Sequence, residues 1–550
     1  MKNKLMYRFS ILRKLAPFAE GVKKYFFYKL MSNGIIVLVS LLLPYVYGMY
    51  IEKTIMNGDG YFLFAVISVY IGAAILNMGC ELFSNKCTYT LNNKVSVVLR
   101  LKFLDKRFTQ KFSTYNEIDC ANEKMLLDDA IFKLCAFSGP QSIDYFLKLF
   151  QTVCLVCVLL ILEWRLALIM IISIPVTMWL NDLNARMAKD NNNQTWNNNR
   201  AWGNHIYRSI SSWREIRAMQ LEKSCEKTFN DYSQQYSGIF RIYTRFWVTR
   251  RFFLRKLKEE FIMQILLVSL GGWLIMNGHI TIGALLAFIQ YYNQLAESFQ
   301  TVVSTESDLK INSIEYDKVF EVLEQTTIGE KLPSWSPDNV SICVNNISFK
   351  YPKGDVEVFN DFSLIILQGE RVGVVGESGS GKTTLLNLLV GVLEPDKGEI
   401  TFGGKNIMTH NISPIHKRVG FVLQDNMIFN TTIKENLLYV KENATDEEIY
   451  LACKKARLTD YIDGMPEGMN TVVGERGMCL SGGERQRLVL ARAFLKDVDV
   501  FISDEATSAL DQRTENLIQE AIEEISRDKT IIVVSHRESS LSVCDRRVYL

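Results

Sequence analysis

Residues 371–390 read RVGVVGESGSGKTTLLNLLV, and this stretch decides the fold of the second half of the chain. A short valine-rich run leads into a glycine-rich loop, and the residues after Lys382 have the composition of a helix. Glycines allow backbone N–H groups to close around phosphates at a helix N-terminus. The flanking strand and helix favour a phosphate-binding loop over a glycine-rich turn with an incidental lysine. We therefore predict an α/β domain that binds a nucleoside triphosphate.

The loop supplies most of the predicted nucleotide contacts. We expect Lys382 to reach the β- and γ-phosphates, and the hydroxyl of Thr383 to hold Mg²⁺. The predicted contacts in this segment are Gly376, Glu377, Ser378, Gly379, Ser380, Gly381, Lys382, Thr383 and Thr384.

A second strand, residues 498–505 (VDVFISDE), ends in two carboxylates. We expect Asp504 to be a Mg²⁺ ligand and Glu505 to polarise the attacking water. The alternative is an exposed acidic strand end. That alternative fits poorly in a chain that also contains a phosphate-binding loop.

The first half of the chain has a different composition, because long uncharged runs occur before residue 304. The uncharged runs are residues 30–51, 60–80, 149–162, 166–181 and 261–296. The first two are long enough to cross a membrane as helices, and a polar turn at residues 277–279 divides the last into two spans. The two middle runs are short enough to be buried soluble helices, but as a hairpin with a charged tip at residues 163–165 they read as spans. Six spans are predicted.

Basic residues predict the orientation of these spans. They precede the first span and fill the two long connections, residues 81–148 and 182–260, whereas the short tips hold only Lys53, Arg165 and His279. By the positive-inside rule, both termini and both connections are cytoplasmic. The connections are long and poor in Gly and Pro, so we expect helical extensions. An Asn-rich piece, residues 191–199, fits either a polar helix surface or a disordered tract.

Composition excludes several classes of protein. The 550 residues include 62 Lys and Arg against 60 Asp and Glu, and a net charge of +2 implies no nucleic-acid-binding field. The 11 cysteines are scattered, which argues against a disulfide-built scaffold, and we expect Cys154 and Cys157 to be buried rather than redox-active. The N-terminus lacks the pattern of a cleavable signal peptide. The high usage of Lys, Asn, Ile, Phe and Tyr suggests an AT-rich bacterial genome. The protein is therefore expected in a bacterial plasma membrane.

Residues 480–487, LSGGERQR, match the signature of the ATP-binding cassette (ABC) proteins. Four further residues occur in the order of that family: Tyr351, where the family places an aromatic side chain on adenine, Gln424 of the Q-loop, Asp511 of the D-loop and the switch histidine His536. The chain thus resembles a half-transporter of the ABC exporter family. The resemblance implies an all-α six-helix transmembrane domain (1–325), a linker (326–339) and an α/β P-loop NTPase cassette (340–550).

The resemblance also implies a mechanism. Two cassettes would meet head to tail, with Ser481, Gly482 and Gly483 of one closing over ATP bound to the other. Glu505 would act as general base, His536 would hold the γ-phosphate, and Gln424 would sense Mg²⁺. A homodimer is the simpler reading, and a heterodimer stays open. The segments near residues 119–126 and 212–219 would couple the cassette to the spans.

Three departures from the family pattern stand out. Ser503 replaces the apolar residue that the family usually has before Asp504. The first extension lacks the Gly-Glu-Leu turn common in drug and lipid exporters. The sequence stops at Leu550, where the family usually continues, so the cassette is either truncated or short at its C-terminus.

Two functions fit these observations. The first is ATP-driven export of an amphipathic peptide, lipid or drug-like molecule, and the second is a nucleotide-gated sensor, channel or regulatory subunit. The complete set of catalytic residues favours export. The polar residues Gln290, Asn293, Gln294 and Glu297 share one helix face, which either lines a translocation cavity or marks the end of the helix that emerges into water.

Overall fold

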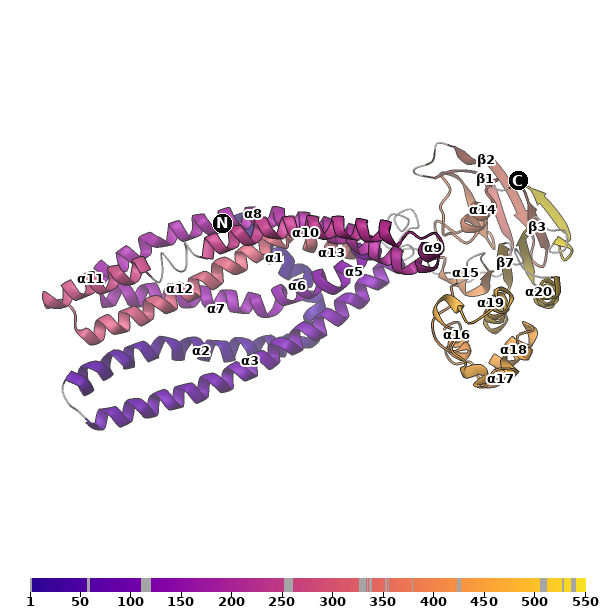
Figure 1. The fold of residues 1–550 in the computed structure, drawn as a ribbon. Helices are drawn as coiled ribbons and strands as arrows, with labels where there is room; N and C mark the ends of the chain where they lie inside the picture. The colour runs from indigo at the N-terminus through magenta and orange to yellow at the C-terminus, as the bar shows by residue number, and fades with distance from the viewer. Residues whose placement is uncertain are drawn as a thin grey trace. The chain divides into compact units, whose positions relative to one another are not determined.

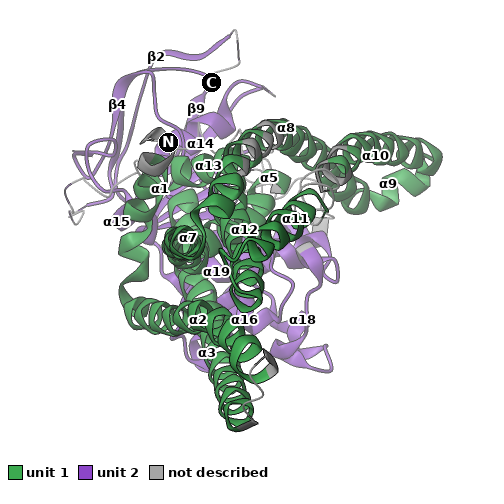
Figure 2. Cartoon of the chain, turned by 90° about the vertical axis from the view of Figure 1, so that its left-hand side faces the viewer, with its two compact units in different colours: residues 1–108, 118–325 green, residues 109–117, 326–550 purple. Residues whose placement is uncertain are grey.

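The chain forms two compact units, residues 1–108 with 118–325 and residues 109–117 with 326–550 (Figure 2). Each unit has its own buried hydrophobic clusters. A computed structural model describes residues 2–56, 60–109, 120–251, 261–325, 333, 335, 339–351, 354, 356–377, 379–422, 427–504, 512–526, 529–535 and 541–550.

The first unit is helical throughout its described residues (Figure 1). Its long helices are α2 (Lys23–Tyr50), α3 (Gly60–Phe108), α7 (Ser142–Leu162), α8 (Trp164–Ser211), α10 (Glu222–Arg251), α11 (Met263–Met276) and α12 (Ile282–Ile311). Shorter pieces are α1 (Lys2–Leu15), η1 (Ala16–Val22), η2 (Ile51–Met56), α5 (Cys120–Met125), η3 (Leu126–Ala130), α6 (Ile131–Ala136), η4 (Phe137–Gln141), α9 (Trp213–Ala218) and α13 (Ser313–Glu324).

Helices occupy all six places where spans are predicted. Among the described residues, three helical stretches are long and apolar enough to cross a membrane, and two shorter apolar stretches accompany them. These are Tyr7–Thr54, Tyr61–Phe108 and Ala121–Leu162, followed by Trp164–Trp179 and Met263–Met276. The helix at the sixth place, α12, carries polar side chains along its length, so the number six stays a prediction.

The predicted turns lie where the helices end. Glu163 is extended and its carboxylate accepts a hydrogen bond from the N–H of Arg165, which caps the start of α8. Thr281 caps α12 in the same way, through the N–H of Ala284. The two hairpins are therefore closed by local hydrogen bonds. The prediction for the CxxC pair is wrong at Cys157, which is exposed on α7, while Cys154 is half-buried.

Helices α2 and α12 touch through their backbones. A Cβ atom on Gly283 would lie 2.4 Å from the carbonyl oxygen of Gly48, so no side chain fits between the two helices there. About two helical turns further along, the hydroxyl of Tyr291 donates to the carbonyl of Leu41 at 2.7 Å. Small residues at such crossings permit the close approach that holds membrane helices together.

The N-terminal helix α1 is fixed by a buried arginine. The Arg8 side chain is fully buried, its Nη2 donates to Glu306 Oε1 on α12 at 3.0 Å, and its guanidinium lies 3.6 Å from the ring centroid of Tyr145 on α7. An arginine held between a carboxylate and an aromatic face is stabilised by both. Helix α1 is thereby joined to two helices that are distant in sequence.

The Asn-rich piece is helical and faces its own unit. It lies within α8, where Asn192 Nδ2 donates to Glu315 Oε1 at 2.9 Å. Trp196 is buried, with the ammonium of Lys318 4.9 Å from its ring. Of the two readings left open by the sequence, the polar helix surface is correct.

The second unit contains two sheets. The antiparallel sheet has the order β2-β1-β4-β5 and consists of β1 (Ile342–Lys350), β2 (Glu357–Ile366), β4 (Lys397–Phe402) and β5 (Lys405–Asn406). The parallel sheet has the order β6-β7-β8-β3-β9 and consists of β3 (Arg371–Val375), β6 (Val419–Val422), β7 (Val500–Asp504), β8 (Thr530–Val534) and β9 (Arg546–Tyr549). Strands β7 and β8 are buried at every position, as expected for the interior of a parallel sheet.

The second unit also contains seven described helices. They are α14 (Lys382–Leu389), α15 (Ser413–Arg418), α16 (Ile433–Leu438), α17 (Asp446–Lys455), α18 (Thr459–Asp463), α19 (Gly482–Lys496) and α20 (Gln512–Ile525), with short turns η6 (Gly468–Asn470) and η7 (Glu475–Gly477). Of these helices, α14, α15 and α19 contact the parallel sheet. The loop between β3 and α14 and the end of β7 lie at the same edge of the parallel sheet, since parallel strands end on one side. This edge holds the candidate site.

Candidate functional site

The glycine-rich loop after β3 has a backbone that other residues could not easily adopt. Gly379 and Gly381 have φ values of 87° and 98°, in the left-handed region. A Cβ on Gly381 would also lie 2.7 Å from Val358, and a Cβ on Gly376 would lie 2.5 Å from the hydroxyl of Ser380. The loop is therefore shaped by its glycines, and backbone N–H groups are left at the start of α14.

Lys382 lies against this loop. Its ammonium donates to the carbonyl oxygens of Gly376 and Glu377 at 2.9 and 2.8 Å. An ammonium has three N–H donors, so one is left for a phosphate oxygen. The Ser380 hydroxyl oxygen is buried without a partner among the described residues. A buried polar atom without a partner and a lysine with a spare donor fit an anionic ligand.

The predicted metal ligands lie together. Thr383 Oγ1 donates to Asp504 Oδ2 at 2.9 Å, although 121 residues separate them and β8 lies between their strands. Asp504 is buried at the end of β7, whereas Thr383 is exposed. A hydroxyl and a carboxylate at one point are the oxygen ligands that Mg²⁺ prefers, so the residues present fit this ion.

Tyr351 lies beside the same helix. Its hydroxyl is 3.0 Å from the hydroxyl of the buried Thr384, and its ring packs edge-on against Phe349 with centroids 5.0 Å apart. The side chain is half-buried and comes from the end of β1. The antiparallel sheet thus brings an aromatic ring to the phosphate-binding loop.

The signature segment forms the start of α19. Ser481 is exposed and its hydroxyl accepts from the N–H of Glu484, whose carboxylate accepts from the N–H of Ser481 at 2.7 Å. This reciprocal capping box fixes the first turn. Gly482 is half-buried, and a Cβ on the buried Gly483 would lie 2.0 Å from the methyl group of Thr514 on α20.

Five predicted site residues lie outside the described residues: Ser378, Gln424, Glu505, Asp511 and His536. Of the predicted set, the structure brings together Gly376, Glu377, Gly379, Ser380, Gly381, Lys382, Thr383, Thr384, Tyr351 and Asp504. Ser503, beside the metal ligand, is buried in β7, and its hydroxyl has no partner among the described residues.

Sequence reasoning missed two kinds of supporting residue. Glu484 closes the capping box, and the Ser-x-x-Glu pattern within the signature carries that signal. Val358 and Thr514 press against the glycines of the loop and of the signature. Nothing in their local sequence predicts these contacts, because the residues meet only after the domain has folded.

On the membrane side, the predicted polar face of α12 is partly accessible. Asn293 and Glu297 are exposed, and Gln290 and Gln294 are half-buried. The helix runs on to Ile311, so these side chains lie in its middle rather than at its end. The short helix α9 lies between α8 and α10 and has no buried residue, with Trp213 57% exposed.

Comparison with known proteins agrees with this architecture. Residues 27–299 match the family model of the ABC transporter transmembrane region, and residues 359–508 match that of the ABC transporter. A protein of Bacillus subtilis strain 168, named as a candidate multidrug export ATP-binding/permease protein, is 27% identical over 98% of this chain and 94% of its own length. A protein of Staphylococcus aureus strain NCTC 8325 / PS 47 with the same description is 36% identical over 52% of this chain and half of its own length.

A solved structure shares the fold. The structure of a bacterial Atm1-family ABC exporter with ATP bound superposes with a TM-score of 0.84, at 20% identity, over 98% of this chain and 94% of that one. The chain therefore belongs to the ABC transporters, and it joins a helical membrane domain and an ATP-binding cassette of the exporter type. It is an integral membrane protein that binds ATP and couples its hydrolysis to transport.

Proposed function

We propose that this protein exports an amphipathic molecule, a peptide, a lipid or a drug-like compound, as a homodimer of half-transporters that alternates between inward-facing and outward-facing states. The observation that carries the proposal is the pairing of Thr383 with Asp504 beside a formed phosphate-binding loop. The relatives named as candidate multidrug exporters support the substrate class.

The phosphate-binding loop would hold ATP through its backbone N–H groups, Lys382 and the side chain of Ser380. Mg²⁺ would be held by Thr383 and Asp504, with Gln424 as a further ligand, and would neutralise phosphate charge. Tyr351 would stack on the adenine. Glu505 would take the proton of the attacking water, and His536 would hold the γ-phosphate.

The position of the signature supports dimerisation. The start of α19 presents an exposed Ser481 and a helix N-terminus, which attracts negative charge. Gly482 and Gly483 let a phosphate approach the backbone there. A second copy of the chain would supply that phosphate with its own loop, and Asp511 would lie at the interface between the two cassettes. ATP would thus join two copies, and hydrolysis would release them.

Helix α9 would carry the motion of the cassettes to the membrane helices. None of its residues is buried and its Trp213 is exposed, as expected of a surface that packs against another domain. The exposed polar side chains Asn293 and Glu297 of α12 would line the translocation cavity. Both termini would be cytoplasmic in a bacterial plasma membrane, since basic residues concentrate at that end of the spans.

The first test is ATP hydrolysis by the purified chain alone in lipid vesicles, with and without vanadate. The wild type is expected to turn over, and Glu505→Gln is expected to bind ATP and lose hydrolysis by at least about 100-fold, the usual scale for a lost general base. Candidate peptides, lipids and drugs are then compared by how much each stimulates the rate of ATP hydrolysis. ATP binding without hydrolysis by the wild type would overturn the homodimer proposal and favour a missing partner subunit or a regulatory role.

A matched pair of variants tests the metal ligands. Asp504→Asn and Thr383→Ala are expected to raise the Mg²⁺ concentration that gives half-maximal hydrolysis, because each removes an oxygen ligand. Ser503→Ala, one residue from Asp504, is the control and is expected to leave the Mg²⁺ requirement unchanged. An equal shift in all three variants would indicate a folding defect instead of a metal site.

A further inference from the structure

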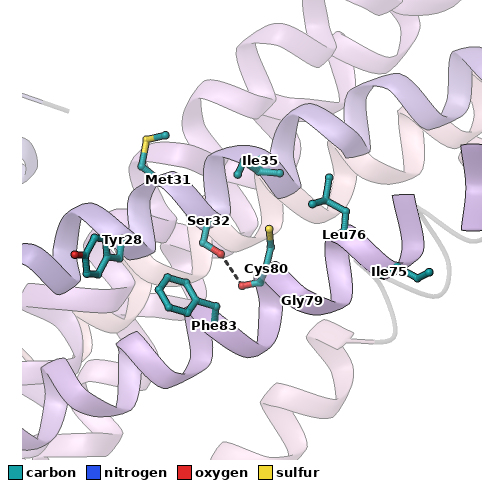
Figure 3. A pocket seen from close by; sticks show the side chains of 9 residues that line it. All are labelled: Tyr28, Met31, Ser32, Ile35, Ile75, Leu76, Gly79, Cys80 and Phe83. Atoms are coloured by element: carbon teal, nitrogen blue, oxygen red, sulfur yellow. Dashed lines mark hydrogen bonds between the residues drawn. The ribbon is translucent and has the colours of Figure 1, made fainter. Parts of the chain in front are cut away.

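A groove of about 450 Å³ lies between α2 and α3, and side chains of both helices line it (Figure 3). Met31 and Ile35 of α2 face Ile75 and Leu76 of α3 across it, and almost all of its surface is carbon. The hydroxyl of Ser32 donates to the carbonyl of Cys80 at 2.6 Å, so the polar group inside the groove is already satisfied. The groove therefore offers an occupant mainly apolar contact.

Aromatic residues continue from one end of the groove. Phe83 and Tyr28 line that end, with ring centroids 6.0 Å apart, and Tyr25 follows at 6.4 Å from Tyr28. Tyrosines are enriched where a membrane helix leaves the hydrocarbon and meets the headgroups. The groove therefore lies at the depth of acyl chains, and Tyr25 lies at the depth of headgroups.

Two lysines stand at that headgroup level. The ammonium groups of Lys24 on α2 and Lys94 on α3 lie 5.3 and 5.5 Å from the ring centroid of Tyr25. Both side chains are exposed, and neither has a carboxylate partner among the described residues. The nearby Lys29 differs, because it is buried and paired with Asp144 at 3.1 Å. Lys24 and Lys94 are therefore free to neutralise an anion.

We propose that this groove binds an anionic phospholipid of the surrounding bilayer, with one acyl chain between α2 and α3 and the phosphate held by Lys24 and Lys94. The inference rests on the proposed membrane orientation, which puts these lysines at the cytoplasmic leaflet, where anionic lipids attract basic residues. An apolar channel that ends in two unpaired cations at one aromatic side chain matches the shape and charge of such a lipid.

The test uses photolabelling of the full chain in detergent micelles that contain phosphatidylglycerol or phosphatidylcholine with a diazirine in one acyl chain. Labelled peptides are mapped by mass spectrometry. The wild type is expected to be labelled within residues 28–35 and 75–83 and to prefer phosphatidylglycerol by roughly fivefold to 25-fold, since each lysine near an anionic surface contributes about fivefold.

Matched variants distinguish binding of the lipid headgroup from binding of the acyl chain. Lys24→Gln with Lys94→Gln is expected to abolish the preference for phosphatidylglycerol, whereas Lys23→Gln with Lys86→Gln changes the same charge on the same helices and is expected to keep it. Gly79→Leu fills the groove, because a Cβ there meets nothing within 4 Å, and is expected to lose the labelling of both lipids. Gly79→Ala leaves room and is expected to retain it.

Labelling needs no turnover, so the same measurement on Glu505→Gln separates this inference from the proposed transport. Equal loss of preference in both lysine pairs would overturn the headgroup site. Labelling elsewhere on the chain, or crosslinks from the groove to a second copy in place of lipid, would overturn the acyl-chain site.

Discussion

At the residue scale, the glycines of the cassette are the most constrained positions. Gly483 lies so close to Thr514 that a Cβ atom added to the glycine would overlap the threonine methyl group. The sequence motif predicts that Gly483 contacts a phosphate, yet the packing against Thr514 alone would exclude any side chain. The same residue thus serves the predicted binding surface and the junction between α19 and α20.

This double role gives a stability prediction. Gly483→Ala is expected to lower the stability of the cassette by about 1–3 kcal/mol, the usual cost of overpacking a core. Adding Thr514→Ser removes the methyl group and is expected to restore most of the thermal unfolding temperature. If the double variant unfolds as early as the single one, the clash at Thr514 is not the cause.

The sequence predicts individual site residues well where a motif fixes their spacing, as in the loop from Gly376 to Thr384. It could not predict that Lys382 donates to the carbonyls of its own loop, because that contact depends on the loop's conformation. It also identified the departure at Ser503 but not its consequence, a buried hydroxyl in an interior strand that has no partner among the described residues.

At the scale of elements, uncharged runs predicted where the membrane helices lie, because the bilayer imposes both length and apolar composition. The packing of α2 on α12 was not predictable in this way. It depends on Gly48 and Gly283, which are 235 positions apart in the sequence and carry no mutual pattern. Glycine is also common in membrane helices, so neither residue by itself predicts a helix crossing.

The contact between α2 and α12 can be tested with two glycines. Gly283→Ala is expected to destabilise the membrane unit, because the new methyl group would lie 2.4 Å from a backbone oxygen that cannot move independently. Gly272→Ala adds the same methyl group to α11, where nothing lies within 4 Å, and is expected to be neutral. The melting temperatures of the two variants are compared in detergent, with size-exclusion chromatography as the readout of unfolding. Equal melting temperatures would contradict the close crossing.

At the scale of the whole molecule, the proposed dimer would bury Cys479, which is exposed two residues before Ser481. In the second unit, burial raises the pKa of Cys453 to about 12 and, with Asp545, that of Cys544 to about 11. Both stay protonated thiols at neutral pH and react slowly with a maleimide. Peptide mapping can therefore follow the labelling of Cys479, because Cys453 and Cys544 react much more slowly.

ATP is expected to slow the labelling of Cys479 about tenfold in Glu505→Gln, as for a side chain moved into a packed interface. The half-buried Cys343 of β1 serves as the internal reference. Protection that appears only after another half-transporter is added would contradict the homodimer. No change under any condition would contradict the position of the signature at the interface.

The anchor of the N-terminal helix has a consequence for biosynthesis. Arg8 and its partner Glu306 are 298 positions apart, and synthesis proceeds at about 5–20 residues per second. The arginine therefore leaves the ribosome roughly 15 to 60 seconds before the carboxylate that neutralises it. During that interval the Arg8 guanidinium lacks its carboxylate, although Ile11 and Leu15 of α1 belong to one buried cluster with residues of α3 and α6 that are made much earlier. The first helix to be made thus receives its last anchor only when α12 has been synthesised.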